Sequence, residues 1–470
     1  MPTVEEVLAH GWQLHQSGNI EAAVDLYRRV LAHAPRNANA LVYLGIAQFD
    51  QRDFDASASL YRKALSIQSR FPIAWNNLGN SLRMLGRVDE AEAAFATALE
   101  QQPGYLSALL NRGTLWIWNG DIKQGLKWYS EGLKIDPNHA ELHRNLGVIH
   151  LLLGNYELGW NEYRWRWQMP GTYRPRVSAP IWQGESVDGK SILLYPEQGR
   201  GDAIQFIRVA SVLKRAGATV YVQVDSEMMP LFSLMTGIDM LLPTGSVVPP
   251  IDYHASFIDV VDHWYGRTGE LPYAGDLFSD QEGYLNANPN LVTHWRGWLH
   301  RQIPSGQIPS GRRVGINWQG NPEHHADVYR SIRLESLAPL GAIEDVSLVS
   351  LQFGVGTEQI DSCSLADSII TLPNGIDTDA FTDTAAILKS LDVVVTSDTA
   401  IAHLAGALGI NVLVMLGKVP DWRWLTEGDQ TAWYPTMRLV RQTELGNWAE
   451  VVRQVQRRLR EEPFAEQSRH

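Results

Sequence analysis

The chain has 470 residues, more than a single hydrophobic core ordinarily supports, so about three domains are expected. Its 44% hydrophobic and 20% charged residues are typical of a globular protein and exclude a fibrous or disordered one. The net charge of -12 argues against nucleic acid as a partner, because proteins that bind nucleic acid carry a basic surface.

The single cysteine and the first residues indicate the compartment. Cys363 stands alone, which excludes an intrachain disulfide and a multi-cysteine metal site and favours a reducing environment. The opening stretch "MPTVEEVLAHGWQ" is acidic and amphipathic, and no apolar run reaches the ~18 residues that a membrane span needs. We therefore expect a cytoplasmic protein with no membrane span.

The first third of the chain repeats at a step of 34 residues. Glycines follow this step at Gly11, Gly45, Gly79, Gly113 and Gly147. Aromatic residues follow it at Tyr27, Tyr61, Phe95, Tyr129 and Tyr163. Turn glycines follow it at Gly18, Gly86, Gly120 and Gly154, with Arg52 as the exception. The period resembles the tetratricopeptide repeat, a helical hairpin whose small residues let two helices approach while an aromatic fills the gap between hairpins. About five units over residues 1–168 should therefore stack into an α-helical superhelix with a concave face.

The fifth unit ends in "YELGWNEYRWRWQMP", where three aromatic residues share one helical face. Trp160, Tyr163 and Trp167 recur at i, i+3 and i+7. Such a stripe is typical of burial, so we expect it to join the repeats to the next domain. A platform that stacks on a sugar is the alternative.

The remainder of the chain has the pattern of α/β domains. From about Ser191, short β-rich runs such as "SILLYP" and "TVYVQV" alternate with helical stretches such as "DAIQFIRVASVLKRAG", which predicts parallel strands with crossover helices. The stretch "IPSGQIPSGR", near residues 303–312, is typical of a linker. We predict two Rossmann-like domains, residues 169–302 and 303–470, facing a cleft in which ligands bind beyond the carboxyl ends of the strands.

The segment "SDTAIAHLAGALG" follows the apolar run "DVVVT" in the second α/β domain. Ser397 or Asp398 is expected to cap the helix that begins here, whose free N–H groups would favour an anion such as a diphosphate. Thr399 and His403 are four residues apart, so both side chains can reach one ligand. For His403 the alternative is a packed core histidine.

Further candidates for this donor site follow two strands of the same domain. Asn317 and Gln319 end the strand of "GINWQGNPEHHADVYRSIRL", which then offers Arg330 and Arg333. A guanidinium fits a diphosphate well, although each arginine could equally lie on the surface. Gln352, in the run "VSLVSLQF", completes the set.

A strand-to-helix turn in the first α/β domain reads "EQGRGDAIQF". Gln198, Gly199, Gly201 and Gln205 are expected to form a loop on the acceptor side. Asp202 stands at the start of the helix, where a carboxylate serves either as a cap or as a general base.

The same turn admits a dinucleotide-binding interpretation. Asp225, at the end of the second strand, stands about where an acid would bind ribose. However, Ile204 occupies the position that requires a glycine or alanine, so we do not favour this interpretation.

Two patterns come close to metal sites without matching them. In "HAELH", His139 and His143 have the spacing of a zinc helix, but Glu141 is one position too late. In "IDTDAF", Asp377 and Asp379 form a D-x-D motif that leads directly into a helix, where capping is expected. We therefore predict no metal site.

The stretch "KVPDWRWL" follows the next strand of the second domain. Lys418, Trp422, Arg423 and Trp424 should either line the cleft or pack the edge of the domain.

These motifs together resemble a known group of enzymes. "SDTAIAHLAGALG" resembles the donor-site segment of the ADP-heptose lipopolysaccharide heptosyltransferases, whose pattern falls on Asp398, Thr399, Ala400 and His403, with alanine where glycine is common. The order of repeats, "EQGRGDAIQF", "GINWQGNPEHHADVYRSIRL", "SDTAIAHLAGALG" and "DWRWL" is similar to bacterial tetratricopeptide-repeat glycosyltransferases, including flagellin-modifying ones. The resemblance implies a GT-B fold, a nucleotide-sugar donor held at this segment, inversion of the anomeric centre, and Asp202 as the base that deprotonates the acceptor hydroxyl.

The expected function is therefore that of a metal-independent glycosyltransferase without a cofactor. The second α/β domain would bind the nucleotide sugar, the first would face the acceptor, and the repeats would recruit an acceptor protein such as flagellin or another surface protein. The alternative is a non-catalytic scaffold of repeats with a nucleotide-binding GT-B-like domain.

Overall fold

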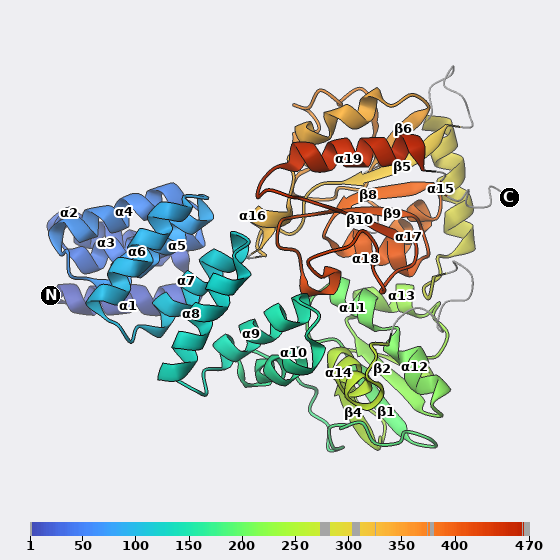
Figure 1. Cartoon of the computed structure of the whole chain (residues 1–470), viewed down its shortest axis with the longest axis horizontal. Coiled ribbons are helices and arrows are strands. Elements are labelled where there is room, and N and C mark those ends of the chain that lie inside the picture. The colour runs from blue at the N-terminus through green and yellow to red at the C-terminus, as the bar shows by residue number, and fades with distance from the viewer. Residues whose placement is uncertain are drawn as a thin grey trace. The chain divides into compact units, whose positions relative to one another are not determined.

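A computed structural model describes residues 2–272, 283–302, 311–324, 326–373, 375–376, 380–462 and 464. The chain divides into two units, Met1–Ile149 and His150–His470, whose helices and strands are labelled in Figure 1. Most of the predicted linker, 303–310, lies outside the described residues.

The first unit consists of helices that pair along the chain into antiparallel hairpins (Figure 1). The helices are α1 (Val4–Gln16), α2 (Ile20–His33), α3 (Ala38–Asp50), α4 (Phe54–Ile67), α5 (Pro72–Met84), α6 (Val88–Gln101), α7 (Leu106–Trp118), α8 (Ile122–Ile135) and α9 (Ala140–Leu152), the last of which extends into the second unit. The predicted array of tetratricopeptide hairpins is confirmed.

Contacts between glycines and aromatic rings explain the 34-residue step. A Cβ atom on Gly79 would lie 2.5 Å from the ring of Phe95, and one on Gly11 would lie 2.6 Å from the ring of Tyr27. Each ring therefore packs on the glycine of its own hairpin, where any larger residue would separate the two helices. Tyr27 also stacks on Tyr43 of the next hairpin at 5.5 Å, so it bridges neighbouring units as well.

The turns inside the hairpins all take the left-handed backbone conformation. The turn glycines have φ values of 85°, 72°, 92° and 76° at Gly18, Gly86, Gly120 and Gly154. Arg52 takes the same conformation with φ 65°, although it carries a side chain. Because non-glycine residues rarely adopt this region, the turn of the second hairpin is strained.

The second unit begins with α10 (Tyr156–Tyr163) and the 3-10 helix η1 (Arg164–Gln168). Trp160 is only 2% exposed and meets Trp422 edge-on at 5.5 Å, so this stripe is buried as predicted. The chain changes from α to 3-10 geometry at Arg164, however, so Trp167 does not continue the same helical face. Its Nε1 instead donates a hydrogen bond to Asp259 at 3.0 Å.

The first α/β domain contains a parallel sheet in the order β3-β2-β1-β4. The strands are β1 (Ser191–Tyr195), β2 (Thr219–Val224), β3 (Met240–Pro243) and β4 (Tyr253–Ser256). The helical segments are α11 (Arg200–Phe206), α12 (Val209–Arg215), η2 (Ser226–Met228), α13 (Met229–Phe232), α14 (Phe257–Thr268) and α15 (Pro289–Gln302). The stretch "DAIQFIRVASVLKRAG", expected as helical, is broken between α11 and α12, where the Arg208 side chain bonds the carbonyl of Gln205.

The second α/β domain contains a parallel sheet in the order β10-β9-β8-β5-β6-β7. The strands are β5 (Arg312–Asn317), β6 (Val346–Ser350), β7 (Ile369–Ile370), β8 (Val393–Ser397), β9 (Val412–Leu416) and β10 (Met437–Arg441). The helical segments are α16 (Asp327–Arg330), η3 (Leu334–Ala342), η4 (Thr357–Gln359), α17 (Thr382–Leu388), α18 (Ala400–Ala407), η5 (Trp422–Trp424) and α19 (Trp448–Glu461). Strands β8 and β9 are buried throughout, as their continuous apolar runs predict for a sheet covered on both faces.

The predicted order of a helical repeat array followed by two Rossmann-like domains is confirmed. The limits at residues 168 and 302 stay predictions, since both α/β domains belong to one unit. In the part of the chain that the structure describes, no helix has the length and apolar character that a membrane crossing requires.

Candidate functional site

The two motifs singled out in the α/β domains lie side by side. Helix α11 begins beyond β1 and α18 begins beyond β8, both at carboxyl ends of parallel strands. A Cβ atom on Gly201 would lie 3.2 Å from Cδ2 of His403 and 3.5 Å from Cα of Ala400, the first residue of α18. Glycine therefore permits the first turns of the two helices to touch.

Asp202 forms an ion pair across this junction with Arg423 of η5. The guanidinium of Arg423 is 6% exposed and also bonds Asp421 at 2.6 Å, whereas the Asp202 side chain is 22% exposed. Burial raises the pKa of the Asp202 carboxyl and the charge of Arg423 opposes that rise. The N-cap of α11 is Gly199, so Asp202 does not stand at the N-cap position, although its carboxylate accepts a hydrogen bond from the backbone of Gly199.

The first turn of α18 lacks a side-chain cap. Thr399 stands at the N-cap position and makes no capping hydrogen bond, so the prediction that Ser397 or Asp398 caps this helix is wrong. Thr399 does not cap the helix because its Oγ1 donates a hydrogen bond to Oδ1 of Asn317, at the end of the neighbouring strand β5, at 2.9 Å. The first N–H groups of α18 therefore receive no side-chain acceptor from the described residues.

Further unpaired polar atoms surround this helix start. Arg330 donates through Nη1 to the backbone carbonyl of Asp398 at 3.0 Å, and its Nε lies 3.7 Å from the carboxylate of Asp327, too far for a hydrogen bond. Among the described residues, Nε of Arg330 and Oγ of Ser397 are buried without a hydrogen-bond partner. Unpaired buried donors are costly, and amides, a guanidinium and a hydroxyl together suit a phosphate.

Asp398 adds a titratable group to this place. Burial, with a smaller contribution from the charge of Asp421, raises the pKa of Asp398 to about 6, and Arg330 opposes the rise. The carboxyl of Asp398 therefore loses its proton near pH 6.

Three predicted donor residues form an internal network at the ends of β5 and β6. Gln352 Oε1 accepts hydrogen bonds from Asn317 Nδ2 at 2.8 Å and from the backbone N–H of Gln319 at 3.0 Å. Gln352 Nε2 donates to the carbonyl of Val355 at 2.8 Å. The side chains of Asn317 and Gln352 are thus engaged by the protein, an arrangement that positions the strand ends. Arg333, by contrast, is exposed just before η3.

His403 is packed between aromatic side chains. Its ring stacks on Trp424 at 5.4 Å, and its Nδ1 shares a hydrogen bond of 3.0 Å with the hydroxyl of Tyr434. Burial, followed by the charge of Arg423, lowers the pKa of His403 well below its ordinary value, so the ring is neutral. The contribution of His403 to donor binding stays a prediction.

The residues expected to form the acceptor-side loop differ in their exposure to solvent. Gln198 is exposed and donates to the hydroxyl of Tyr163 at 2.6 Å, and Gly199 beside it is also exposed. Gln205 is fully buried, and neither atom of its side-chain amide has a partner in the described chain. Gln205 therefore belongs to the buried face of α11 rather than to an exposed loop.

The stretch "KVPDWRWL" packs the junction of the two α/β domains. Trp422 stacks on Phe206 at 6.2 Å and both Trp422 and Trp424 are buried, whereas Lys418 is exposed and bonds the carbonyl of Thr443. Of the two alternatives for this stretch, the structure therefore supports packing for its tryptophans.

A second buried ionic cluster was missed from the sequence. Arg166 of η1 bonds Glu197 and Asp259, each at 2.6 Å, and all three side chains are almost fully buried. Desolvation raises the pKa of Glu197. The charged residues inside the aromatic stretch "YRWRWQ" were the available signal, because buried arginines need such partners.

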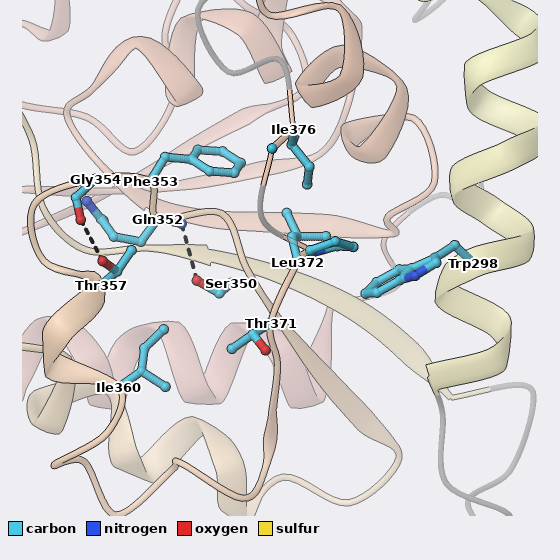
Figure 2. Close-up of a pocket in the computed structure, with 12 residues that line it drawn as sticks. Trp298, Ser350, Gln352, Phe353, Gly354, Thr357, Ile360, Thr371, Leu372 and Ile376 are labelled. Carbon is cyan, nitrogen blue, oxygen red and sulfur yellow. Dashed lines mark hydrogen bonds between the residues drawn. The ribbon is translucent and has the colours of Figure 1, made fainter.

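A pocket of about 610 Å³ opens beyond the carboxyl ends of β6 and β7 (Figure 2). It is lined by Trp298, Ser350, Gln352, Phe353, Gly354, Thr357, Ile360, Thr371, Leu372, Pro373, Gly375 and Ile376. Figure 2 shows Trp298 of α15 and Leu372 on one side, with Gln352 and Thr357 opposite. Gln352 links this pocket to the start of α18 through Asn317 and its bond to Thr399.

Asp377 and Asp379 of the D-x-D motif lie outside the described residues. Within the residues that are described, no group of three or more histidine, cysteine, aspartate or glutamate side chains is arranged to hold a metal ion.

Comparison with known protein families identifies the same repeats in the first unit. The tetratricopeptide repeat family matches residues 8–72, 49–105 and 82–146. A thermophilic TPR protein of Thermus thermophilus is 19% identical, and the match covers 36% of this chain and 93% of that protein with a TM-score of 0.33.

Two curated relatives have further similarity. Protein FlbA of Caulobacter vibrioides is 25% identical over 419 residues, covering 85% of this chain and 69% of that protein. The probable UDP-N-acetylglucosamine–peptide N-acetylglucosaminyltransferase SPINDLY of Hordeum vulgare is 34% identical over 170 residues, covering 35% of this chain and 18% of that protein. An alignment over 85% of the chain must extend beyond the repeats, so the similarity to FlbA includes part of the α/β region. This protein carries tetratricopeptide repeats at residues 8–146.

Proposed function

We propose that the chain is a glycosyltransferase of the GT-B type, which moves a sugar from a nucleotide-sugar donor to an acceptor hydroxyl. One observation carries the proposal: the partly exposed carboxylate of Asp202 lies beside the uncapped first turn of α18, with Gly201 in contact with Ala400. A general base next to an anion site is the arrangement that such a transfer needs.

The donor diphosphate would bind at the start of α18. The N–H groups of the first turn, the guanidinium of Arg330 and the hydroxyl of Ser397 are the donors available there. The pocket beyond β6 and β7 would hold the nucleoside, since its aromatic and polar lining suits a base and a ribose.

The reaction would be a displacement at the anomeric carbon. The acceptor oxygen forms the new bond to this carbon while Asp202 takes the hydroxyl proton. The bond from the anomeric carbon to the phosphate oxygen breaks, and the nucleotide leaves with the electron pair. The first turn of α18 and Arg330 stabilise the charge that develops on the leaving phosphate.

The repeats would recruit the acceptor, which we take to be a protein. Stacked tetratricopeptide hairpins commonly form protein-binding surfaces, and the relative SPINDLY is named as a probable peptide glycosyltransferase. Flagellin or another surface protein modified in the cytoplasm is the acceptor class we propose.

Thermal unfolding with a panel of UDP, GDP, ADP, dTDP and CMP and their sugars tests the proposal. A ligand at ten times its dissociation constant stabilises the folded protein by about 1.4 kcal/mol, which should identify one nucleotide. Release of that nucleotide from its sugar, lost in Asp202→Asn, would establish turnover. Binding without release would support the scaffold alternative, and no binding by any nucleotide would refute the donor site.

A further inference from the structure

We propose that Arg423 is shared between Asp202 and the donor diphosphate, so that the base is released only after the donor has bound. This inference rests on the proposed function and adds to it an order of events. In the chain without donor, Arg423 holds the carboxylate of Asp202. The donor phosphates then compete for the same guanidinium, and Asp202 becomes free to accept a proton.

The guanidinium of Arg423 is already divided between partners. Its Nη2 bonds Asp202 and its Nη1 bonds Asp421 at 2.6 Å. Its Nε is buried and has no hydrogen-bond partner among the described residues. A guanidinium with one unpaired N–H group can donate a hydrogen bond to a further acceptor. Its planar geometry fits phosphate as well as carboxylate.

Arg423 lies beside the first turn of α18. The adjacent residue, Trp424, stacks on His403 of that helix, and Gly201, which precedes Asp202, touches Ala400 at its start. The charge of Arg423 also slightly opposes the rise in the pKa of Asp398, which precedes the helix. The ion pair is therefore next to the place where the proposed phosphates bind.

The charges at this place favour an exchange of partners. Four carboxylates, those of Asp202, Asp327, Asp398 and Asp421, share two guanidiniums, those of Arg330 and Arg423. A diphosphate brings further negative charge, which must take cationic partners from the carboxylates already present. Asp202 holds Arg423 from across the junction between the α/β domains, and losing this partner raises the basicity of its carboxylate.

The backbone around Arg423 is held in place by its neighbours. Leu425 has φ 57°, a strained value for a non-glycine residue. Arg441 donates to the carbonyls of Leu425 at 2.9 Å and of Gly428 at 2.7 Å, which fixes this loop. These contacts hold the loop that carries Arg423 close to the start of α18.

Calorimetric titration of the full chain with inorganic pyrophosphate tests the exchange. Asp202→Asn removes the competing carboxylate, so we expect pyrophosphate to bind about five- to tenfold more tightly, close to the ~1.4 kcal/mol of one tenfold step. In the Arg423→Gln background the same Asp202→Asn change should give no gain. This comparison separates the exchange from the simple loss of a negative charge. Asp239→Asn, an exposed aspartate of the same domain, is the control and should leave the affinity unchanged.

The outcomes distinguish this inference from the proposed function. If the wild type binds pyrophosphate but Asp202→Asn tightens binding equally with and without Arg423, the exchange is wrong while the donor site stands. If the wild type does not bind pyrophosphate, the proposed donor site fails and the exchange fails with it. Should Asp202→Asn not fold, Asp421→Asn, which frees the other side of the same guanidinium, provides the equivalent cycle.

Discussion

Asp202 of α11 and Arg423 of η5 form a partly buried ion pair that joins the two α/β domains, across 221 positions of the sequence. The pair brings the carboxylate of the first domain to the uncapped helix start of the second. The position of a proposed catalytic base is thus tied to the contact between these domains.

Replacing Asp202 tests its assignment as the base. We expect Asp202→Asn to lower kcat by about 10²- to 10⁴-fold, the usual contribution of a general base. Binding of the nucleotide sugar should not weaken, because asparagine keeps the shape of the side chain and removes a carboxylate that competes with the phosphates for Arg423. Single-turnover rates at saturating donor and acceptor provide the measurement, with Asp239→Asn as the control. Full turnover by Asp202→Asn would exclude this residue as the base.

Arg330 and Arg333 offer a matched pair for the phosphate site. Arg330 bonds the carbonyl of Asp398 and has a buried unpaired Nε, whereas Arg333 is exposed. Arg330→Gln should weaken the binding of a nucleoside diphosphate by about 10- to 100-fold, the value of a charged hydrogen bond. Arg333→Gln should change it by less than about twofold. Equal losses in a calorimetric titration would contradict this distinction.

Asp398 should make stability depend on pH. Its pKa of about 6 in the folded chain lies above the ordinary value, so between about pH 4 and 6 the folded protein binds more protons than the unfolded chain. The free energy of unfolding therefore falls as the pH rises through this window.

The variant Asp398→Asn isolates that effect. It should raise the free energy of unfolding of the α/β unit by about 1–2 kcal/mol at pH 7.5 and by about a third as much at pH 4.5, where the folded carboxyl is protonated but that of the unfolded chain is still mostly ionised. Denaturant unfolding at both pH values measures the difference, with exposed Asp367→Asn as the control. A gain of the same size at both pH values would show that the charge of Asp398 is not the cause.

Arg52 should be a weak point of the repeats. It has φ 65° where the corresponding residues of other hairpins are glycine. Arg52→Gly should stabilise α3 and α4 by about 0.5–1 kcal/mol, since relief of the left-handed strain exceeds the added freedom of the unfolded chain. Hydrogen exchange of the α3–α4 peptides measures this gain. The reverse change at an equivalent turn, Gly86→Ala, should be destabilising; if Gly86→Ala has no cost, strain at these turns is not significant.

Much of the fold could be predicted because its contacts are local. Gly79 contacts Phe95, which follows it by only 16 residues. The packing inside one hairpin therefore depends on a short spacing between glycine and aromatic residue, and this spacing recurs along the sequence. The apolar runs that became β8 and β9 are likewise continuous segments of sequence. Both kinds of pattern can be recognised without knowing what lies elsewhere in the chain.

The candidate site was predictable only in part. The motifs around Asp202 and Asp398 were identified, but the choice between Arg330 and Arg333 was open. The cap of α18 was also misplaced, because the hydroxyl of Thr399 bonds Asn317 on another strand. Local capping propensities cannot predict that a residue of another strand will take the hydroxyl as a hydrogen-bond donor.

The sequence by itself determined the repeats, the succession of strands and helices, and the segments that approach the site, since each depends on neighbours along the chain. Only the tertiary structure decided that Arg423 pairs with Asp202, that the start of α18 is uncapped, and that Gln205 is buried. These features depend on residues that are distant in sequence and come into contact only when α11 packs against α18. Contacts of this kind follow no regular spacing along the chain, so a sequence pattern cannot predict them.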